Sequence, residues 1–149
     1  MKLPGEHIFV TGGAKGIGEA IVRDCVANGA SASFVDIDET AGNKLATELS
    51  SAGYKAAFAK ADVANFDELK TAFELLVSKL GNVTGVVNNA GVNSHADPVK
   101  MTDKEWDDFF AIDMKSIWLT AKLALPRSEE HTSELQSHLN LVCRLLLEK

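Results

Sequence analysis

Three glycines, spaced by four and then two residues, follow a short apolar run near the start of the chain. The segment Thr11–Gly18 reads TGGAKGIG and joins a predicted strand, His7–Thr11, to a predicted helix that begins at Gly16. Where a strand turns directly into a helix, backbone N–H groups and the positive end of the helix point to one place, and a diphosphate binds well there. Gly12 permits the tight turn, Gly16 lets a bound group approach the backbone, and Gly18 lets the helix pack close to the strand.

Lys15 and Ile17 belong to the same turn, and we include both among its expected cofactor-binding residues. The competing phosphate-binding motif, the P-loop, requires Gly-Lys-Ser/Thr at its end. Here Lys15 precedes Gly16 and neither Ser nor Thr follows, so hydrolysis of a magnesium nucleotide is disfavoured. A glycine-rich connection without a ligand is the structural alternative.

A carboxylate stands at the spacing that a dinucleotide-binding turn requires. Asp36 follows the second predicted strand, Ser31–Val35, about 20 residues beyond the glycines. It can accept two hydrogen bonds from the hydroxyls of an adenosine ribose, it would repel a 2′-phosphate, and Ile37 supplies no Arg to bind that phosphate. NAD is therefore favoured over NADP. The alternative for Asp36 is an N-cap of the next helix, a role that Asp38 fills at least as well.

Asp62 and Val63 follow the third predicted strand, Lys55–Lys60, at the carboxyl edge of a parallel sheet. The carboxylate of Asp62 can hold the amino group of an adenine, and Val63 can cover the ring. On residue type alone, a simple turn aspartate explains Asp62 equally well.

Short apolar runs alternate with longer amphipathic segments over residues 1–126. Gly85–Asn88 is the fourth predicted strand. Helices are expected over residues 16–28, 39–51, 65–81 and 102–125, the last two opened by the capping boxes Asn65/Glu68 and Thr102/Glu105. The alternation predicts an α/β fold, a doubly wound parallel sheet of the Rossmann type in one domain.

These motifs together resemble the short-chain dehydrogenase/reductase family. The resemblance covers Lys2 through Pro126 and rests on the glycine turn, Asp36, Asp62-Val63, Asn88-Asn89-Ala90-Gly91 and the helix start Trp106-Asp107. In this family the Asn-Asn-Ala-Gly run ends the fourth strand, which implies that Asn89, Ala90 and Gly91 lie against the nicotinamide-side ribose. The resemblance implies an NAD(P)-dependent oxidoreductase that interconverts an alcohol and a carbonyl by hydride transfer, with NAD favoured.

The family's catalytic residues do not occur at matching positions. The family uses a Tyr, a Lys four residues later and a Ser upstream, but the only tyrosine is Tyr54, and the fourth residue after it is Phe58. The resemblance therefore implies a fragment, truncated after the fourth strand and the helices that follow it, which is itself inactive. Asp113, seven residues past Trp106, occupies the position at which the family usually has an Asn in its proton relay, and it is our one catalytic candidate. An ionised Asp accepts hydrogen bonds but donates none, which puts the usual relay in doubt.

Two other interpretations stay open, a non-catalytic dinucleotide-binding module and an inactive fragment that does not fold stably. For Asp113 the structural alternative is a partly exposed helix carboxylate. The partners implied by the resemblance are a small-molecule substrate for the full-length protein and a second copy of that protein, whereas association of the fragment is doubtful. The residues that would identify the substrate lie beyond the segment that resembles the family.

The composition changes after Pro126, where Ser, Glu, His and Leu replace the Ala and Gly that are frequent before it. Apolar residues from Leu135 to Leu146 recur at steps of three and four, so the segment is expected to be helical if it is ordered. Arg127–Lys149 also resembles one reading frame of a common sequencing-library adapter. We therefore interpret residues 127–149 as a non-native tail and leave them out of the predicted fold.

Charge and composition exclude several other classes of protein. The formal net charge of -6 argues against a nucleic-acid partner, which requires clustered Lys and Arg. The sequence has neither an apolar run of the roughly 18 residues that a membrane-spanning helix needs nor a secretory signal, so no membrane partner and a cytoplasmic location are expected. Cys25 lies in a helical pattern, and neither it nor Cys143 has a His at metal-binding spacing, so no metal site is expected.

Overall fold

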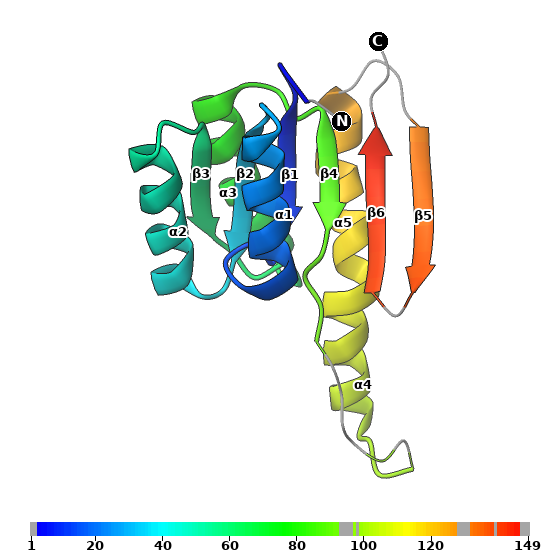
Figure 1. The fold of residues 1–149 in the computed structure, drawn as a ribbon. Coiled ribbons are helices and arrows are strands. Elements are labelled where there is room, and N and C mark those ends of the chain that lie inside the picture. Colours follow the sequence, from blue (N-terminus) through cyan, green and yellow to red (C-terminus); the bar gives the residue numbers. More distant parts are fainter. Residues whose placement is uncertain (1–2, 93–96, 98, 128–131, 139, 147–149) are drawn as a thin grey trace.

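The computed structural model describes residues 3–92, 97, 99–127, 132–138 and 140–146, in which strands and helices alternate (Figure 1). The first four strands are β1 (His7–Thr11), β2 (Ser31–Asp36), β3 (Ala56–Lys60) and β4 (Gly85–Asn88). The helices are α1 (Gly16–Ala27), α2 (Glu39–Ser51), α3 (Phe66–Leu80), α4 (Asp103–Phe110) and α5 (Ser116–Ala124). A π-helical turn, η1 (Ala111–Lys115), joins α4 to α5, and a 3₁₀ turn, η2 (Leu125–Arg127), follows α5.

The four strands β1–β4 are parallel and lie in the order β3-β2-β1-β4. The chain moves outward from β1 to β3 and then crosses back through α3 to β4, so the strand order reverses between β1 and β4. In open α/β sheets a ligand binds outside the carboxyl ends of the strands at such a reversal. The topology alone therefore indicates the carboxyl ends of β1 and β4 as the expected ligand-binding region.

Helices cover both faces of the sheet (Figure 1). On one face Ile8 and Val10 of β1 pack with Val22 of α1 and Leu45 of α2. On the other face Phe9 packs with the side chains of α3 and α5, and its ring meets that of Phe73 edge to face at a centroid distance of 5.1 Å. Successive side chains of β1 thus pack into two hydrophobic cores, one on each face of the sheet. This confirms the doubly wound arrangement expected from uninterrupted apolar strands.

The structure also shows how the helices begin. Thr102 forms the expected capping box with Glu105 at the start of α4. Asn65 caps α3 through its side chain, but the carboxylate of Glu68 accepts hydrogen bonds from the backbone N–H of Asp62 and the side chain of Asn65 instead of closing the box. The expected Asn65/Glu68 box is therefore only half formed, because the preceding turn offers Glu68 a different donor.

The described residues after Arg127, 132–138 and 140–146, do not form the expected helix. They form two strands, β5 (Thr132–His138) and β6 (Asn140–Leu146), that pair antiparallel with each other, and β6 also pairs antiparallel with β4. The outer edge of β4 would otherwise expose unpaired backbone groups, and such an edge is a template for any extended segment of chain. Pairing along that edge outweighs the helical spacing of the tail, and the sheet is parallel only over β1–β4.

Candidate functional site

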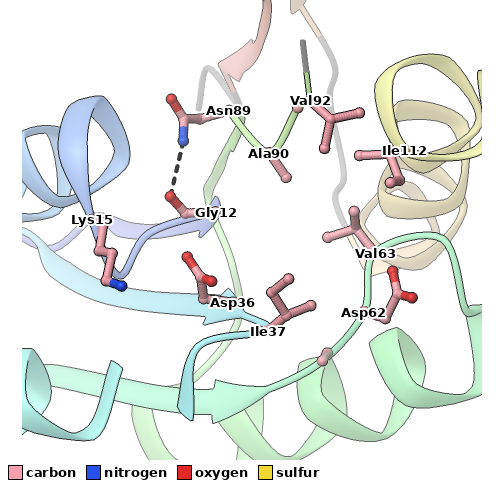
Figure 2. Close-up of a pocket in the computed structure, with 12 residues that line it drawn as sticks. Gly12, Lys15, Asp36, Ile37, Asp62, Val63, Asn89, Ala90, Val92 and Ile112 are labelled. Carbon is pink, nitrogen blue, oxygen red and sulfur yellow. Dashed lines mark hydrogen bonds between the residues drawn. The ribbon is translucent and has the colours of Figure 1, made fainter. Parts of the chain in front are cut away.

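An open pocket of about 360 Å³ lies at the carboxyl ends of β1–β4, next to the reversal of strand order (Figure 2). Its size is within the range of small-molecule sites, about 300–1,000 Å³. Its wall consists of Gly12, Lys15, Asp36, Ile37, Ala61, Asp62, Val63, Asn89, Ala90, Gly91, Val92 and Ile112. The glycine turn, both carboxylates and the end of β4 therefore meet in one place. Gly16, Ile17 and Gly18, which are also expected cofactor-binding residues, lie in the first turn of α1 and are not part of the wall.

Ile37, Ala61, Val92 and Ile112 line the pocket and are absent from the sequence-based set. Ile37 could have been found, because an Ile directly after the carboxylate that ends β2 is placed at the same sheet edge. Its side chain is 70% exposed, which is unusual for an Ile and leaves its apolar surface available to a ligand. Val92 and Ile112 come together only through the tertiary fold, and local patterns carry no signal for them.

The glycine turn has the geometry that the spacing predicts. Gly12 has a φ of +64°, and a Cβ there would lie 2.8 Å from Cα of Ala90. A Cβ on Gly18 would collide with the carbonyl oxygen of Gly12. Gly16 differs from both, because its φ of +58° favours glycine while the space above it is open to 4 Å. The first and third glycines thus allow close packing, and the middle one leaves room for a bound group to approach the backbone.

The N-terminus of α1 has no side-chain cap. Its N-cap residue, Lys15, makes no capping hydrogen bond, whereas α2, α3 and α4 are capped by the side chains of Asp38, Asn65 and Thr102. The first N–H groups of a helix have no partner within the helix and must be satisfied by a cap, by water or by a ligand. An uncapped helix start beside an open glycine fits an anion such as a diphosphate.

Asp36 connects the end of β2 to the glycine turn. One carboxylate oxygen, Oδ2, accepts a hydrogen bond from the backbone N–H of Ala14 at 3.0 Å, and Oδ1 accepts one from the N–H of Asp38, also at 3.0 Å. The cap of α2 is Asp38, whose Oδ1 accepts from the N–H of Ala41 at 2.9 Å. These two hydrogen bonds hold the carboxylate of Asp36 in place. Because each carboxylate oxygen can accept more than one hydrogen bond, Asp36 can still accept further bonds from a ligand in the pocket.

Asp62 lies across the pocket from the glycine turn (Figure 2). Its Oδ1 accepts a hydrogen bond from the N–H of Ala64 at 2.9 Å, so it does shape the turn after β3, as the structural alternative expected. Asp62 also lines the pocket. Val63 beside it also lines the pocket but is only 6% exposed, because it packs in the core against side chains of α3.

The end of β4 is fastened to the end of β1. The side-chain amide of Asn89 donates to the carbonyl oxygen of Gly12 at 3.0 Å and to that of Thr11 at 3.2 Å. In return the hydroxyl oxygen of Thr11 accepts from the N–H groups of Asn89 and Ala90, both at 3.1 Å. The amide of Asn89 therefore holds the glycine turn in position, a role that the bare turn signal in the sequence did not indicate.

Asp113 does not line the pocket, but it contacts a residue that does. Its Oδ1 accepts a hydrogen bond from the backbone N–H of Val92 at 2.9 Å. Asp113 lies in the π-helical turn η1, and single π-helical turns inside helices occur frequently at functional sites. The carboxylate thus fixes the chain just after Gly91 and places Ile112 beside Val92 in the pocket wall.

Tyr54 lies away from this edge. It precedes β3, at the amino end of the strand, whereas the pocket lies at the carboxyl ends. Among the residues that the structure describes, no group of three His, Cys, Asp or Glu side chains is arranged to hold a metal ion. Within the same residues, no helix is long and apolar enough to cross a membrane.

Comparison with known proteins agrees with this geometry. The family model described as short chain dehydrogenase matches residues 6–133. The chain belongs to the short-chain dehydrogenase family. Among its relatives are the oxidoreductase UcpA of Salmonella typhimurium, 34% identical over 125 residues, and the L-fucose dehydrogenase of Mus musculus, 36% identical over 123 residues.

The short-chain dehydrogenase segment spans about half the length of the curated relatives that it matches. The two alignments cover 84% and 82% of this chain but 47% and 44% of the relatives. A solved structure described as a blue fluorescent protein from a metagenomic library in complex with NADPH is similar with a TM-score of 0.80 and 30% identity. That match covers 85% of this chain and 52% of the other. The partial coverage is consistent with an N-terminal fragment of a dehydrogenase.

Proposed function

We propose that this chain is the coenzyme-binding part of an NAD-dependent dehydrogenase that interconverts an alcohol and a carbonyl. The observation that carries the proposal is the uncapped start of α1, placed in a glycine turn directly beside the carboxylate of Asp36. When bound, the nicotinamide ring would accept or donate the hydride, and the protein would supply position and electrostatics.

The pocket divides into regions that suit the parts of a dinucleotide. The N–H groups of Gly16, Ile17 and Gly18 would hold the diphosphate, for which the open space above Gly16 leaves room. Asp36 would accept hydrogen bonds from the hydroxyls of the adenosine ribose. Across the pocket, Asp62 would hold the adenine amino group.

Apolar surfaces complete the adenine region and the opposite end of the site. Ile37 and Val63 present apolar surface where the adenine ring would lie. At the other end, Ala90 and Gly91, positioned by the amide of Asn89, would face the nicotinamide-side ribose. Asp113 would act as a positioning residue through its hydrogen bond to Val92.

The preference for NAD is part of the proposal. Asp36 at the end of β2 would repel the 2′-phosphate of NADP, and the exposed Ile37 beside it carries no charge to attract that group. A solved relative holds NADPH, so both coenzymes have to be compared directly.

A non-catalytic binding module is the second candidate for the chain as it stands. Its only tyrosine, Tyr54, lies at the amino end of β3 and not at the pocket edge. We therefore expect coenzyme binding without turnover, and a spectrophotometric assay with NAD and simple alcohols separates the two candidates. Sustained NADH production by the chain would contradict the binding-only interpretation.

The tail and the oligomeric state stay separate hypotheses. We take residues 127–149 as non-native, and encoding codons that differ from the adapter outside its variable index would contradict this. A homo-oligomer of the full-length protein is supported by the apolar residues Trp106, Phe110, Met114 and Trp118, which recur every four positions and are 38% to 58% exposed.

Calorimetric titration of the chain with NAD tests the proposed function. We expect saturable binding at one site and weaker binding of NADP. If the folded chain, checked by circular dichroism, shows no saturable binding of either coenzyme, the proposal is wrong.

A further inference from the structure

A single basic side chain, that of Lys15, belongs to the wall of the pocket as the structure describes it. Lys15 is the N-cap residue of α1, so it stands at the place where a bound anion would approach the helix. Its ammonium group does not point freely into solvent, because Nζ forms an ion pair with Oδ2 of Asp38. The Lys15 side chain is 68% exposed and that of Asp38 is 35% exposed, so both groups remain accessible to a ligand and to salt.

Asp38 is well placed to hold this cation. Its other oxygen, Oδ1, caps α2 by accepting from the N–H of Ala41, and its own N–H donates to Asp36. The hydrogen bonds from Ala41 and Lys15 lower the pKa of Asp38, and the pairing with Asp38 raises the pKa of Lys15. Both groups are therefore charged at neutral pH, where the ion pair can form.

We propose that Asp38 is a specificity-determining residue, which favours NAD over NADP by engaging Lys15, the one basic side chain in the pocket wall that the structure describes. This inference rests on the proposed coenzyme site and adds a residue to it. Asp38 acts through Lys15 and does not itself have to touch the coenzyme, so it is a positioning residue.

The charges around Asp36 explain the expected preference. A phosphate monoester carries close to two negative charges at neutral pH. Near Asp36 it would meet two carboxylates, Asp36 and Asp38, and one ammonium group, Lys15, which together carry one net negative charge. Neutralising Asp38 brings that sum to zero and frees Lys15 to pair with the phosphate. NAD has no phosphate at this position and would be affected much less.

Asp38→Asn is the direct test, because an Asn keeps the side-chain oxygen that caps α2 while losing the charge. Binding of NADH and NADPH to the full chain is measured by calorimetry, with circular dichroism to verify the fold. We expect NADPH affinity to rise about three- to tenfold while NADH affinity changes less than twofold, as for charges at contact distance in a partly exposed site. The gain should shrink as salt is raised, since exposed charges are screened.

Two further variants separate this role from a general effect of charge or structure. Asp108→Asn removes the same charge from an exposed ion pair with Lys104 on α4, outside the pocket wall, and should leave both affinities unchanged. Asp38→Asn combined with Lys15→Gln should show a clearly smaller gain over Lys15→Gln alone, because only the direct repulsion by Asp38 is then removed and there is no freed cation to pair with the phosphate. Asp38→Glu, which keeps the charge, should retain the preference of the original chain.

The outcomes distinguish this inference from the proposed function. If NADH binds but Asp38→Asn leaves the ratio of the two affinities unchanged, the role of Asp38 is wrong and the coenzyme site stands. The same holds if the gain is undiminished in the Lys15→Gln background. If the unaltered chain binds neither coenzyme, the proposed function and this inference both fail.

Discussion

The backbone N–H of Ala14 donates a 3.0 Å hydrogen bond to the carboxylate of Asp36, which joins the glycine turn to the end of β2. The two motifs are 22 residues apart in the sequence, yet one contact sets their relative position. In the proposed dinucleotide site the same carboxylate would bind the ribose while the turn binds the diphosphate. This hydrogen bond within the protein thus fixes the distance between the proposed diphosphate-binding turn and the proposed ribose-binding carboxylate.

Asp36→Ala should weaken NAD binding by roughly ten- to a hundredfold, because hydrogen bonds to a charged group contribute about 1.5–3 kcal/mol. The bias against NADP should relax at the same time, since the repulsion of the 2′-phosphate is lost. Calorimetry with both coenzymes measures the change. Glu74→Ala, which removes an exposed carboxylate of α3 outside the pocket wall, is the matched control and should have no effect. Unchanged affinity of Asp36→Ala for both coenzymes would refute the ribose role.

Gly18→Ala and Gly16→Ala should differ in their effect on stability. An added Cβ on Gly18 collides with the backbone of Gly12, so this variant should lose about 1–3 kcal/mol, as expected for overpacking. Gly16→Ala meets no atom within 4 Å and should lose only the cost of a left-handed backbone, about 1–2 kcal/mol. The larger expected effect at Gly16 is on NAD affinity, where the new methyl group occupies the space left for the diphosphate.

Thermal unfolding and NAD titration of the two glycine variants check this pair of expectations. Gly16→Val, with a larger side chain, should abolish binding in a chain that still folds. Retained affinity in Gly16→Val would show that the turn does not hold the diphosphate.

Replacement of Asp113 should separate its positioning role from a role of its charge. Asp113→Ala removes the acceptor for the N–H of Val92 and should lower NAD affinity about three- to tenfold, the worth of one hydrogen bond of about 1 kcal/mol. Asp113→Asn keeps a side-chain oxygen that can accept the same bond and should bind NAD like the original chain. Equal losses in both variants would mean that the negative charge, not the hydrogen bond, is what matters.

His7 should make the stability of the domain fall in mild acid. Its ring is buried in β1, where Nδ1 donates to the carbonyl oxygen of Gly81 at 3.0 Å and Nε2 accepts from the hydroxyl of Ser33 at 2.7 Å. Burial lowers the pKa of His7 below 6.5, against the smaller raising effect of backbone carbonyls of Gly81 and Asn82. As the pH falls through 6.5, the unfolded chain takes up a proton that the folded chain resists, so the free energy of unfolding decreases.

Urea unfolding between pH 7.5 and 5 checks the role of His7 when the chain is compared with His7→Gln. The carboxylates contribute equally to both proteins, so the difference between the two curves isolates the histidine. We expect the stability of the original chain to fall more steeply below pH 6.5 than that of the variant. Parallel curves would contradict the assignment of a buried neutral His7.

Much of the fold follows from the sequence because its signals are local. The strands β1–β4 and the helices α1–α3 begin and end within one residue of the expected positions, since caps such as Asp38 and stops such as Gly81 act on their immediate neighbours. The same holds for the gathering of Gly12, Asp36 and Asp62 at one edge, because parallel strands place their carboxyl ends together. The fourth expected helix, residues 102–125, begins at its Thr102 cap but is divided by η1 into α4 and α5.

The sequence did not predict features that depend on distant partners. Val92 and Ile112 line the pocket only because η1 packs against the segment after β4. Glu68 does not complete its capping box with Asn65, because its carboxylate accepts a hydrogen bond from the backbone N–H of Asp62 instead. The ion pair of Lys15 with Asp38 likewise joins two turns that are separated in the sequence by α1 and β2. In the tail, the helical spacing was outweighed by the unpaired edge of β4, which no local pattern reveals.

Titration of the folded 149-residue chain with NAD in a calorimeter, in parallel with NADP, tests the account most directly. It predicts a saturable exothermic or endothermic signal for one NAD per chain and weaker binding of NADP. A flat titration with both coenzymes, from a chain whose circular dichroism shows a folded α/β domain, would contradict it.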